Sequence, residues 1–349
     1  MSQSKFGKIP SGDALERVQK SGNYKNGTFQ NIHYTPDLTE GVSYYAVLKE
    51  FLFKRNKRTK PTDILPNKKT DLLHLPGDAN VLVWLGHSSY YMQIDGKRIL
   101  VDPVFSGSAS PVPSTTRAFA GSNIYTSVDF PAIDYLFITH DHWDHLDYKT
   151  IKGLSPVIKT IFCGLGVGEH LKRWGVRESG IVEMDWNQST ESDNGFEIST
   201  VSARHFSGRG FRRNKSLWLS FVLTTPTMKI FIGGDSGYDT HFKKAGKNYG
   251  PFDLAILECG QYDKSWKYIH MLPSEILPAA NDLGAKRLLP VHWGKFALAN
   301  HDWDTPIKEL LAESSNEQYP IPILTPMIGE AVYLNDDMQV FSKWWEGVR

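Results

Sequence analysis

The chain has 349 residues, which is enough for one large domain with appendages. Apolar residues make up 40% of it, and its 10 Trp, 15 Tyr and 18 Phe can fill a large core, so global disorder is excluded. Lys and Arg number 39 against 38 Asp and Glu, which argues against a chain-wide nucleic-acid-binding surface. A local basic patch stays open, but we expect no nucleic-acid partner.

Cysteine content and hydropathy bear on the compartment. Cys163 and Cys259 are too few for a disulfide framework or a Cys-rich zinc module, and we expect buried thiols in a reducing compartment. No apolar stretch approaches the roughly 18 residues of a membrane span. The polar segment Met1 to Pro10 lacks the apolar region of a signal peptide. We therefore expect a cytoplasmic protein, although a trimmed export signal would leave the same sequence.

Residues 1–79 differ in composition from the rest, because they are rich in Gly, Asn, Lys and Pro. Apolar residues at helical spacing predict one helix over 43–53, with Ser43 as its N-cap. A basic cluster follows it: Lys54, Arg55, Lys57, Arg58 and Lys60. We interpret 1–79 as an N-terminal extension and 80–349 as the main domain.

From residue 80 onward, short apolar runs alternate with turn signals, and each run predicts a strand. The runs cover 81–85, 90–94, 98–101, 135–138, 157–163, 197–203, 217–224, 229–232, 254–257 and 287–291. Helical spacing predicts helices over 166–174, 240–249, 273–283 and 305–314. Asp95-Gly96, between two of the runs, predicts a tight hairpin. This mixture predicts a layered α/β fold.

Histidines and carboxylates follow the apolar run that ends at Ile138. His140, His142, Asp144 and His145 give the spacing His-x-His-x-Asp-His. On a loop at the end of a strand, the first two histidines can point the same way, while the last pair faces them from another side. Imidazole and carboxylate suit zinc, manganese or iron, and two adjacent half-sites would make a dinuclear centre. The alternative is a histidine-rich turn without metal.

Three more candidate ligands follow later strands. His205 comes after the run 197–203, Asp235 after 229–232, and His292 after 287–291. Each of them alone would be a polar structural residue. Their order after the first motif favours metal ligands for all three.

The combined pattern resembles the metallo-β-lactamase superfamily, and more closely the family of phospholipases D that hydrolyse N-acylphosphatidylethanolamine. The segments that carry this resemblance are WLGHSS (84–89), LVDPVF (100–105), the motif at 140–145, GDSGY (234–238), GPFDL (250–254) and HWG (292–294). Together they span about residues 80–298.

The resemblance implies an α/β fold, the metallo-β-lactamase αββα sandwich, with two divalent metal ions at one edge. Zinc is the usual metal of the family, with manganese or iron as alternatives. The family pattern assigns two ligand groups and a bridge: His140, His142 and His205; Asp144, His145 and His292; and Asp235 between them. A hydroxide shared by the two ions would then attack phosphorus or a carbonyl carbon, and Asp144 counts as catalytic as well as metal-binding.

Three further residues have candidate supporting roles. His87 lies near the expected site, where it would hydrogen-bond to a ligand or to Asp102; the alternative is a buried histidine satisfied by backbone. Asp102 would orient a metal-binding histidine, or it forms a turn before Pro103. His270 matches a family histidine near the leaving group, where it would bind phosphate or act as a general acid.

Three functions fit these residues. The first is a metal-dependent phosphodiesterase of phospholipase D type that cleaves the bond between phosphate and the head group of an N-acylated phospholipid. The second is a hydrolase of the same fold that acts on a small soluble phosphodiester, ester or lactone. The third, a catalytically silent scaffold, is disfavoured by the complete ligand set. A β-lactamase is disfavoured because Asp235 stands where such enzymes usually have Cys.

Segment 43–60 allows two interpretations for a phospholipid-acting enzyme. Its apolar helix and basic cluster could contact a membrane surface, with the lysines on anionic head groups. Alternatively, the helix packs on the main domain and the lysines are merely solvated, which is the interpretation we favour.

Overall fold

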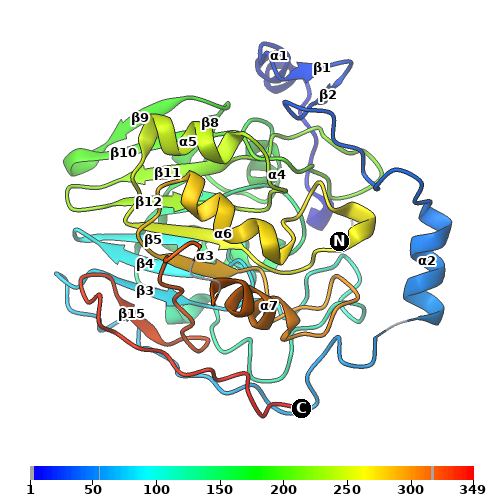
Figure 1. Cartoon of the computed structure of the whole chain (residues 1–349). Coiled ribbons are helices and arrows are strands. Elements are labelled where there is room, and N and C mark those ends of the chain that lie inside the picture. Colours follow the sequence, from blue (N-terminus) through cyan, green and yellow to red (C-terminus); the bar gives the residue numbers. More distant parts are fainter. Residues whose placement is uncertain (1–3, 55, 316–317) are drawn as a thin grey trace.

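Two β-sheets face each other and carry helices on their outer faces in the computed structural model, which describes residues 4–54, 56–315 and 318–349 (Figure 1). One sheet has the order β15 (Ala331–Tyr333), β3 (Val81–Trp84), β4 (Tyr90–Ile94), β5 (Lys97–Val101), β6 (Ile133–Ile138), β7 (Ile158–Gly164) and β8 (Ile181–Met184). The other has the order β14 (Leu288–Val291), β13 (Leu254–Glu258), β12 (Lys229–Ile232), β11 (Ser220–Thr224), β10 (Phe196–Val201) and β9 (Ser189–Ser192).

Strand direction decides where the chain can build a site. Strands β5 to β8 are mutually parallel, as are β12 to β14. β3 runs antiparallel to β4 and β4 to β5, so β3 has the direction of β5; β10 likewise has the direction of β12. The carboxyl ends of β3, β5, β6, β10, β12, β13 and β14 therefore lie at one edge of the sandwich, where ligands bind in open α/β sheets.

The central strands are buried on both faces, which is why they read as continuous apolar runs. In β3, Leu82 and Trp84 belong to the cluster that fills the space between the sheets, whereas Val81 and Val83 pack on the opposite face. The rings of Phe137 and Phe221, one from each sheet, approach to 4.8 Å between centroids. Burying a large side chain of this kind stabilises the fold by about 1.5–3 kcal/mol.

Helices complete the outer layers. Helices α3 (Tyr148–Leu154) and α4 (Gly168–Arg173) pack on the sheet of β3 to β8 through Ile151, Leu154 and Leu171. Helices α5 (His241–Tyr249), α6 (Pro273–Asp282) and α7 (Thr305–Ser314) cover the other sheet, in front of it in Figure 1. The layers are thus helix, sheet, sheet and helix.

The N-terminal segment runs across the surface of this sandwich. It contains α1 (Asp13–Gln19), the short pair β1 (Tyr24–Lys25) and β2 (Thr28–Phe29), and α2 (Tyr44–Phe53). The hydroxyl of Ser43 accepts a hydrogen bond from the backbone N–H of Ala46, so Ser43 is the N-cap of α2 as predicted. Helix α2 stands apart from the sheets at the right of Figure 1.

Our preference for an α2 packed on the main domain is wrong for most of its described apolar side chains, although Val47 is partly buried. Tyr44, Tyr45, Leu48 and Phe53 are 57–78% exposed. The spacing correctly predicted a helix, but spacing does not reveal whether a partner surface is within reach. The side chains of Phe51 and Leu52 and the whole of Arg55 lie outside the described residues.

The predicted strands and helices all form within a few residues of their expected limits. Asp95 and Gly96 have φ values of 48° and 76° and join antiparallel β4 and β5, as the hairpin signal predicted. Cys163 and Cys259 are buried free thiols. Within the described residues, every helix is too short or too polar to cross a lipid bilayer.

Candidate metal centre

The carboxyl ends of the strands bring all seven predicted ligands together. They belong to two groups, and within each group the ligand atoms all lie within 4.8 Å of one another. The first group is His140, His142, His205 and Asp235, and the second is His87, Asp144, His145 and His292. All of these residues except His142 are buried. The loop after β6 supplies both groups, so this one segment joins the two sites.

In the first group, imidazole nitrogens face each other. His142 Nδ1 lies 2.9 Å from His140 Nε2 and 3.2 Å from His205 Nε2. Asp235 Oδ2 lies 3.8 Å from His140 Nε2 and 3.7 Å from His205 Nε2. Three imidazoles and a carboxylate converging in this way form a donor set typical of a transition-metal site.

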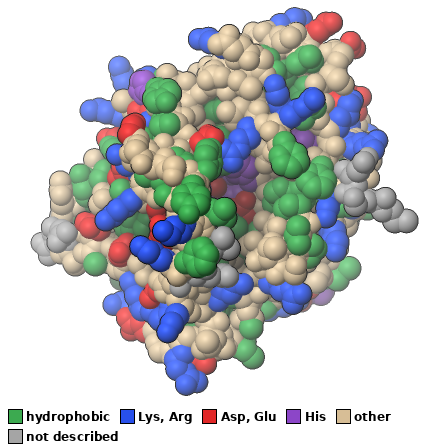
Figure 2. Space-filling model, turned by 90° about the vertical axis from the view of Figure 1, so that its right-hand side faces the viewer, with side chains coloured by type: hydrophobic (Ala, Val, Ile, Leu, Met, Phe, Trp, Pro, Cys, Tyr) green, Lys and Arg blue, Asp and Glu red, His purple; other side chains and the backbone are tan. Residues whose placement is uncertain are grey.

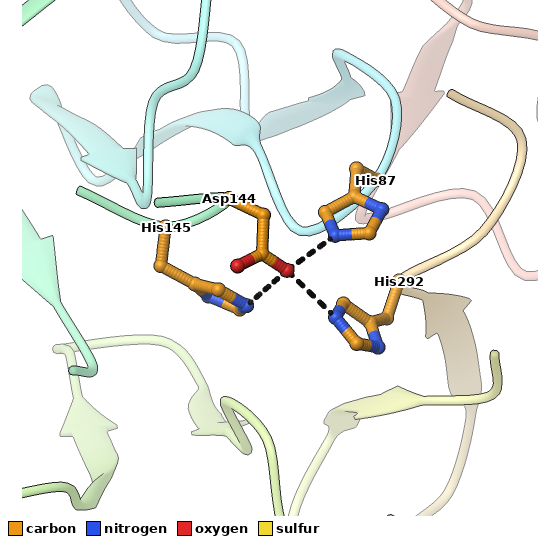
Figure 3. A group of neighbouring side chains, drawn as sticks. All are labelled: His87, Asp144, His145 and His292. Atoms are coloured by element: carbon orange, nitrogen blue, oxygen red, sulfur yellow. Dashed lines mark hydrogen bonds and ion pairs between the residues drawn. The ribbon is translucent and has the colours of Figure 1, made fainter. Parts of the chain in front are cut away.

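In the second group, three imidazoles converge on one oxygen atom of Asp144 (Figure 3). Asp144 Oδ2 lies 2.9 Å from His87 Nε2, 3.2 Å from His292 Nε2 and 3.5 Å from His145 Nε2. Asp235 also reaches this group, with 3.2 Å between its Oδ1 and His145 Nε2 and 3.3 Å between its Oδ2 and His292 Nε2. Asp235 therefore lies between the two groups, where the family pattern predicted a bridging residue.

His87 is an integral part of the second group. Its Nε2 contacts the predicted ligand Asp144, in agreement with the first of the two interpretations from the sequence. Its backbone has φ 54°, and His292 has φ 68°, values that non-glycine residues rarely adopt. The backbone N–H of each is hydrogen-bonded, from His292 to His87 O and from His87 to Trp293 O. Such strain persists only where the surrounding structure holds it, and it concentrates at functional sites.

A carboxylate and a carbonyl group hold the Nδ1 atoms of two histidine rings, on the side of each ring opposite Nε2. Asp102 Oδ2 lies 2.7 Å from His145 Nδ1, as predicted for an orienting residue, and Ile269 O lies 2.8 Å from His205 Nδ1. Hydrogen bonds of this kind select the tautomer that leaves Nε2 free for a metal ion.

Glu258, at the end of β13, is a site residue that the sequence analysis did not identify. Its Oε2 lies 2.5 Å from His270 Nδ1 and 3.3 Å from His292 Nδ1, and Oε1 accepts from the backbone N–H of Met271. The signal was available, because Glu258 ends a buried strand in the same way as Asp102 and Asp235. With Asp235, His270 and His292 it forms a third group of ligand atoms within 4.8 Å of one another.

The electrostatics of the two groups differ. Burial lowers the pKa values of His140 and His205 well below the usual value for histidine. It also lowers the pKa of His142 to about 4. Burial also opposes protonation of His145 and His292, but the neighbouring carboxylates outweigh it. They raise the pKa of His292 to about 10 and that of His145 well above its usual range. The carboxylates thus create a field that favours positive charge at this edge.

The residues fit bound divalent cations. Within the part of the chain that the structure describes, His145 Nε2 and Asp235 Oδ1 are buried polar atoms without a hydrogen-bond partner. Such atoms are costly unless something compensates them, and a cation between them would do so. The donors are imidazoles and carboxylates only, a set that zinc, manganese and iron all accept.

A cavity of about 230 Å³ opens onto these ligands. His142, Asp144, His205, Asp235 and His292 form its inner wall, and His270 also lines it. Its outer part is lined by Leu38, Tyr44, Phe206, Arg213, Trp266 and Leu298, among others. Asp37, Leu38 and Tyr44 line this cavity, so the N-terminal segment contributes to the entrance of the candidate metal centre.

Other histidines and acids near the site have different roles. Asp141, within the motif, belongs to neither group and accepts hydrogen bonds from Gly208 N–H and the Ser216 hydroxyl. His241 contacts the Ser236 hydroxyl at the start of α5, and His301 accepts from the backbone N–H of Gln261. The latter two belong to none of the groups described above.

Comparison with known proteins agrees with this geometry. The family model described as "Beta-lactamase superfamily domain" matches residues 97–293. An uncharacterised protein of Mycobacterium tuberculosis is 37% identical over 333 residues, covering 94% of this chain and 88% of its own length. N-acyl-phosphatidylethanolamine-hydrolyzing phospholipase D 1 of Caenorhabditis elegans is 31% identical over 248 residues, covering 66% of this chain and 68% of its own length.

Solved structures share the fold. Igni18, described as a novel metallo hydrolase from the archaeon Ignicoccus hospitalis, superposes with a TM-score of 0.57 at 20% identity. The superposition covers 73% of this chain and 97% of that one. Sequence, fold and ligand geometry agree, and the chain therefore belongs to the metallo-β-lactamase superfamily of metal-dependent hydrolases.

Proposed function

We propose that this chain is a dinuclear metal-dependent phosphodiesterase of phospholipase D type that acts on N-acylphosphatidylethanolamine-like phospholipids. The observation that carries the proposal is the position of Asp235, within 3.8 Å of imidazole nitrogens from both ligand groups. A carboxylate shared by two groups of histidines suits two closely spaced cations. The homologue named as a phospholipase D in Caenorhabditis elegans supports the substrate class.

Two bound divalent ions would lower the pKa of a water ligand and polarise a phosphoryl oxygen. The chain's own residues would manage the leaving group. His270 lines the cavity, and Glu258 holds its Nδ1, so the ring is fixed with Nε2 available for proton transfer. In hydrolysis, the water oxygen joins phosphorus, the bond from phosphorus to the head-group oxygen breaks, and His270 gives that oxygen a proton. The proton that the attacking water loses passes to solvent, and solvent returns a proton to His270. The products are phosphatidate and an N-acylethanolamine.

The exposed apolar surface beside the cavity supports a membrane-borne substrate. Tyr45, Leu48 and Phe53 of α2 are 73%, 57% and 78% exposed, and Phe211 is fully exposed on the loop after β10. Figure 2 views the side of the molecule on which α2 lies, and hydrophobic side chains surround a hollow where histidines are visible. Exposed aromatic and aliphatic side chains with nearby lysines are typical of surfaces that sit in a bilayer interface. We propose that 43–60 contacts the membrane peripherally.

The size of the cavity also admits a second candidate. At about 230 Å³ it is smaller than the roughly 300–1,000 Å³ that is usual for sites of drug-sized ligands. A head group would fit and the acyl chains would stay outside. A small soluble phosphodiester, ester or lactone would fit as well.

One activity panel separates these candidates. The protein, reconstituted separately with zinc, manganese or iron, is assayed on N-acylphosphatidylethanolamine in vesicles, on bis-para-nitrophenyl phosphate, on para-nitrophenyl acetate and on a lactone. We expect about two metal ions per chain by elemental analysis and release of N-acylethanolamine from the vesicles. Turnover of the soluble substrates alone would favour the second candidate. Two bound metals without any turnover would favour a silent scaffold.

A further inference from the structure

The entrance of the metal cavity contains one ion pair that the proposed chemistry does not use. Arg213 Nη1 donates to Asp37 Oδ2 at 2.8 Å, and both side chains are 46% exposed. Arg213 is the one Lys or Arg among the described residues that line the cavity. Among the described residues that line the cavity, the only arginine or lysine is therefore paired with a carboxylate from the N-terminal segment.

A series of ring contacts connects this arginine to the candidate metal ligands. The Arg213 guanidinium carbon lies 4.7 Å from the centroid of the Phe206 ring. The Phe206 ring lies 4.4 Å from the His142 ring and 4.8 Å from the His205 ring. Phe206 thus separates the guanidinium from the first ligand group by one ring, and a planar guanidinium on an aromatic face is well oriented for an anion.

Contacts made by neighbouring residues of the N-terminal segment fix the position of Asp37. The Tyr44 hydroxyl, at the first residue of α2, donates to Asp37 Oδ2 at 2.7 Å. Two residues after Asp37, the backbone N–H and the hydroxyl of Thr39 donate to Ser265 O and Lys264 O at 2.7 and 2.6 Å. Segment 37–44 therefore crosses the cavity entrance, from the loop that carries Arg213 to the loop that carries Ser265.

We propose that Arg213 is a specificity-determining residue that binds the negatively charged group of the substrate, and that the Asp37 carboxylate occupies this anion position until substrate displaces it. Exposed pairs of this type are weak, so an anion that also gains contacts deeper in the cavity can replace the carboxylate. An arginine pairs with phosphate oxygens through the same planar fork that it offers a carboxylate. The inference rests on the proposed function, because a phosphodiester is the anion that this cavity would admit.

The test compares Arg213→Gln with Arg212→Gln as a matched control. Arg212 is the exposed neighbour, and it lines a different cavity with Phe6 and His170. With bis-para-nitrophenyl phosphate, Arg213→Gln should raise KM roughly 10- to 100-fold and change kcat little, because a charged hydrogen bond is lost before chemistry. Arg213→Lys should recover part of the loss. Arg212→Gln should behave as the unsubstituted protein, and metal content should stay the same in all of them.

Two further measurements isolate charge from shape. Asp37→Asn should lower KM for the phosphodiester, since it removes the competing carboxylate, and it should have no effect in the Arg213→Gln background. With neutral para-nitrophenyl acetate, Arg213→Gln should leave KM unchanged. An equal rise in KM for the neutral and the charged ester, or an equal effect of Arg212→Gln, would overturn the inference.

The inference can fail or hold separately from the proposed function. If the unsubstituted protein hydrolyses no phosphodiester, the proposed function fails. In that case, calorimetry measures the binding of inorganic phosphate to the metal-loaded protein, and this binding decides the role of Arg213. Arg213→Gln should weaken phosphate binding roughly tenfold or more while Arg212→Gln does not; equal binding by both variants would overturn the inference.

Discussion

Asp102 accepts a hydrogen bond from His145 at 2.7 Å between Oδ2 and Nδ1, and the same carboxylate accepts two more from the backbone N–H and the hydroxyl of Thr139. Three donors hold this buried carboxylate in one orientation. The His145 ring is consequently fixed with Nε2 toward Asp144 and Asp235. Asp102 has φ 39°, a region in which Asp and Asn are accommodated more readily than most other side chains.

The first prediction compares Asp102→Ala with Asp102→Asn. Removing the carboxylate should weaken metal binding by about 10- to 100-fold, because the His145 ring loses the contact that orients it. Asparagine keeps one acceptor oxygen and tolerates the backbone angle, so its loss should be smaller. Titration of metal against a competing chelator measures both variants. Wild-type affinity in Asp102→Ala would mean that this contact does not support metal binding.

The second prediction concerns Asp235. Asp235→Asn removes the negative charge that reaches both ligand groups, so turnover should be abolished and the number of metal ions retained per chain should fall. Asp71→Asn is the control, since Asp71 is an exposed residue paired with His74 away from the cavity. Elemental analysis and turnover are measured on the same preparations. Near-normal activity of Asp235→Asn would show that the bridging role belongs to another residue.

The strands and the ligand order were predictable because each rests on a local signal. Buried strands read as apolar runs, and every predicted ligand lies within seven residues after the end of such a run. Three strands of the two sheets, β8, β9 and β15, were missed for a physical reason. Ser189–Ser192 is a polar edge strand without apolar alternation, whereas Ile181–Met184 and Ala331–Tyr333 are short and mostly not fully buried.

Contacts between distant segments were not predictable in this way. The place of Glu258 at a strand end could have marked it as a site residue, but the sequence does not reveal that it holds both His270 and His292, because that depends on how β13 and β14 pair. The exposure of α2 is a similar case, since helical spacing defines an apolar face and not its partner. The contact of Asp37 with Arg213 joins residues far apart in sequence and follows from the path of the N-terminal segment.

The third prediction tests the role of His270 in proton transfer. His270→Ala should keep both metal ions and lose roughly 10²–10⁴ in turnover on substrates with poor leaving groups, whose alkoxide needs a proton. The loss should be much smaller on para-nitrophenyl esters, whose leaving group needs none. Equal loss on both substrates would make His270 a binding or structural residue. Loss of metal would instead assign it, with Glu258, to support of His292.

The fourth prediction tests membrane contact through α2. The triple variant Tyr45→Ser, Leu48→Ser and Phe53→Ser should bind anionic phospholipid vesicles at least tenfold more weakly in a sedimentation assay, because it removes exposed apolar area from the interface. Turnover of bis-para-nitrophenyl phosphate should be unchanged. The control carries Met338→Ser and Val340→Ser, which are 84% and 90% exposed in the C-terminal segment. Equal vesicle binding by the triple variant and the control would contradict membrane contact through α2.

The fifth prediction uses the buried Lys295, which follows His292 by three residues and is 1% exposed. Its Nζ donates to Val104 O at 2.9 Å and to Leu85 O at 3.2 Å. Burial lowers the pKa of Lys295 from 10.5 to about 7, with Asp147 partly opposing. Between these two values the unfolded chain binds more protons at this lysine than the folded chain, so this residue makes the free energy of unfolding rise with pH.

Lys295→Met should therefore have two effects. It leaves two buried carbonyl groups without their donor, which costs about 1–3 kcal/mol each at any pH. It also removes the titration, so the difference in unfolding free energy between the unsubstituted protein and the variant should increase from pH 7 to pH 9, by at most about 1.4 kcal/mol per pH unit. Denaturant unfolding at pH 7, 8 and 9, on metal-loaded protein, measures it. Parallel pH dependences would mean that Lys295 remains charged in the folded protein across this range.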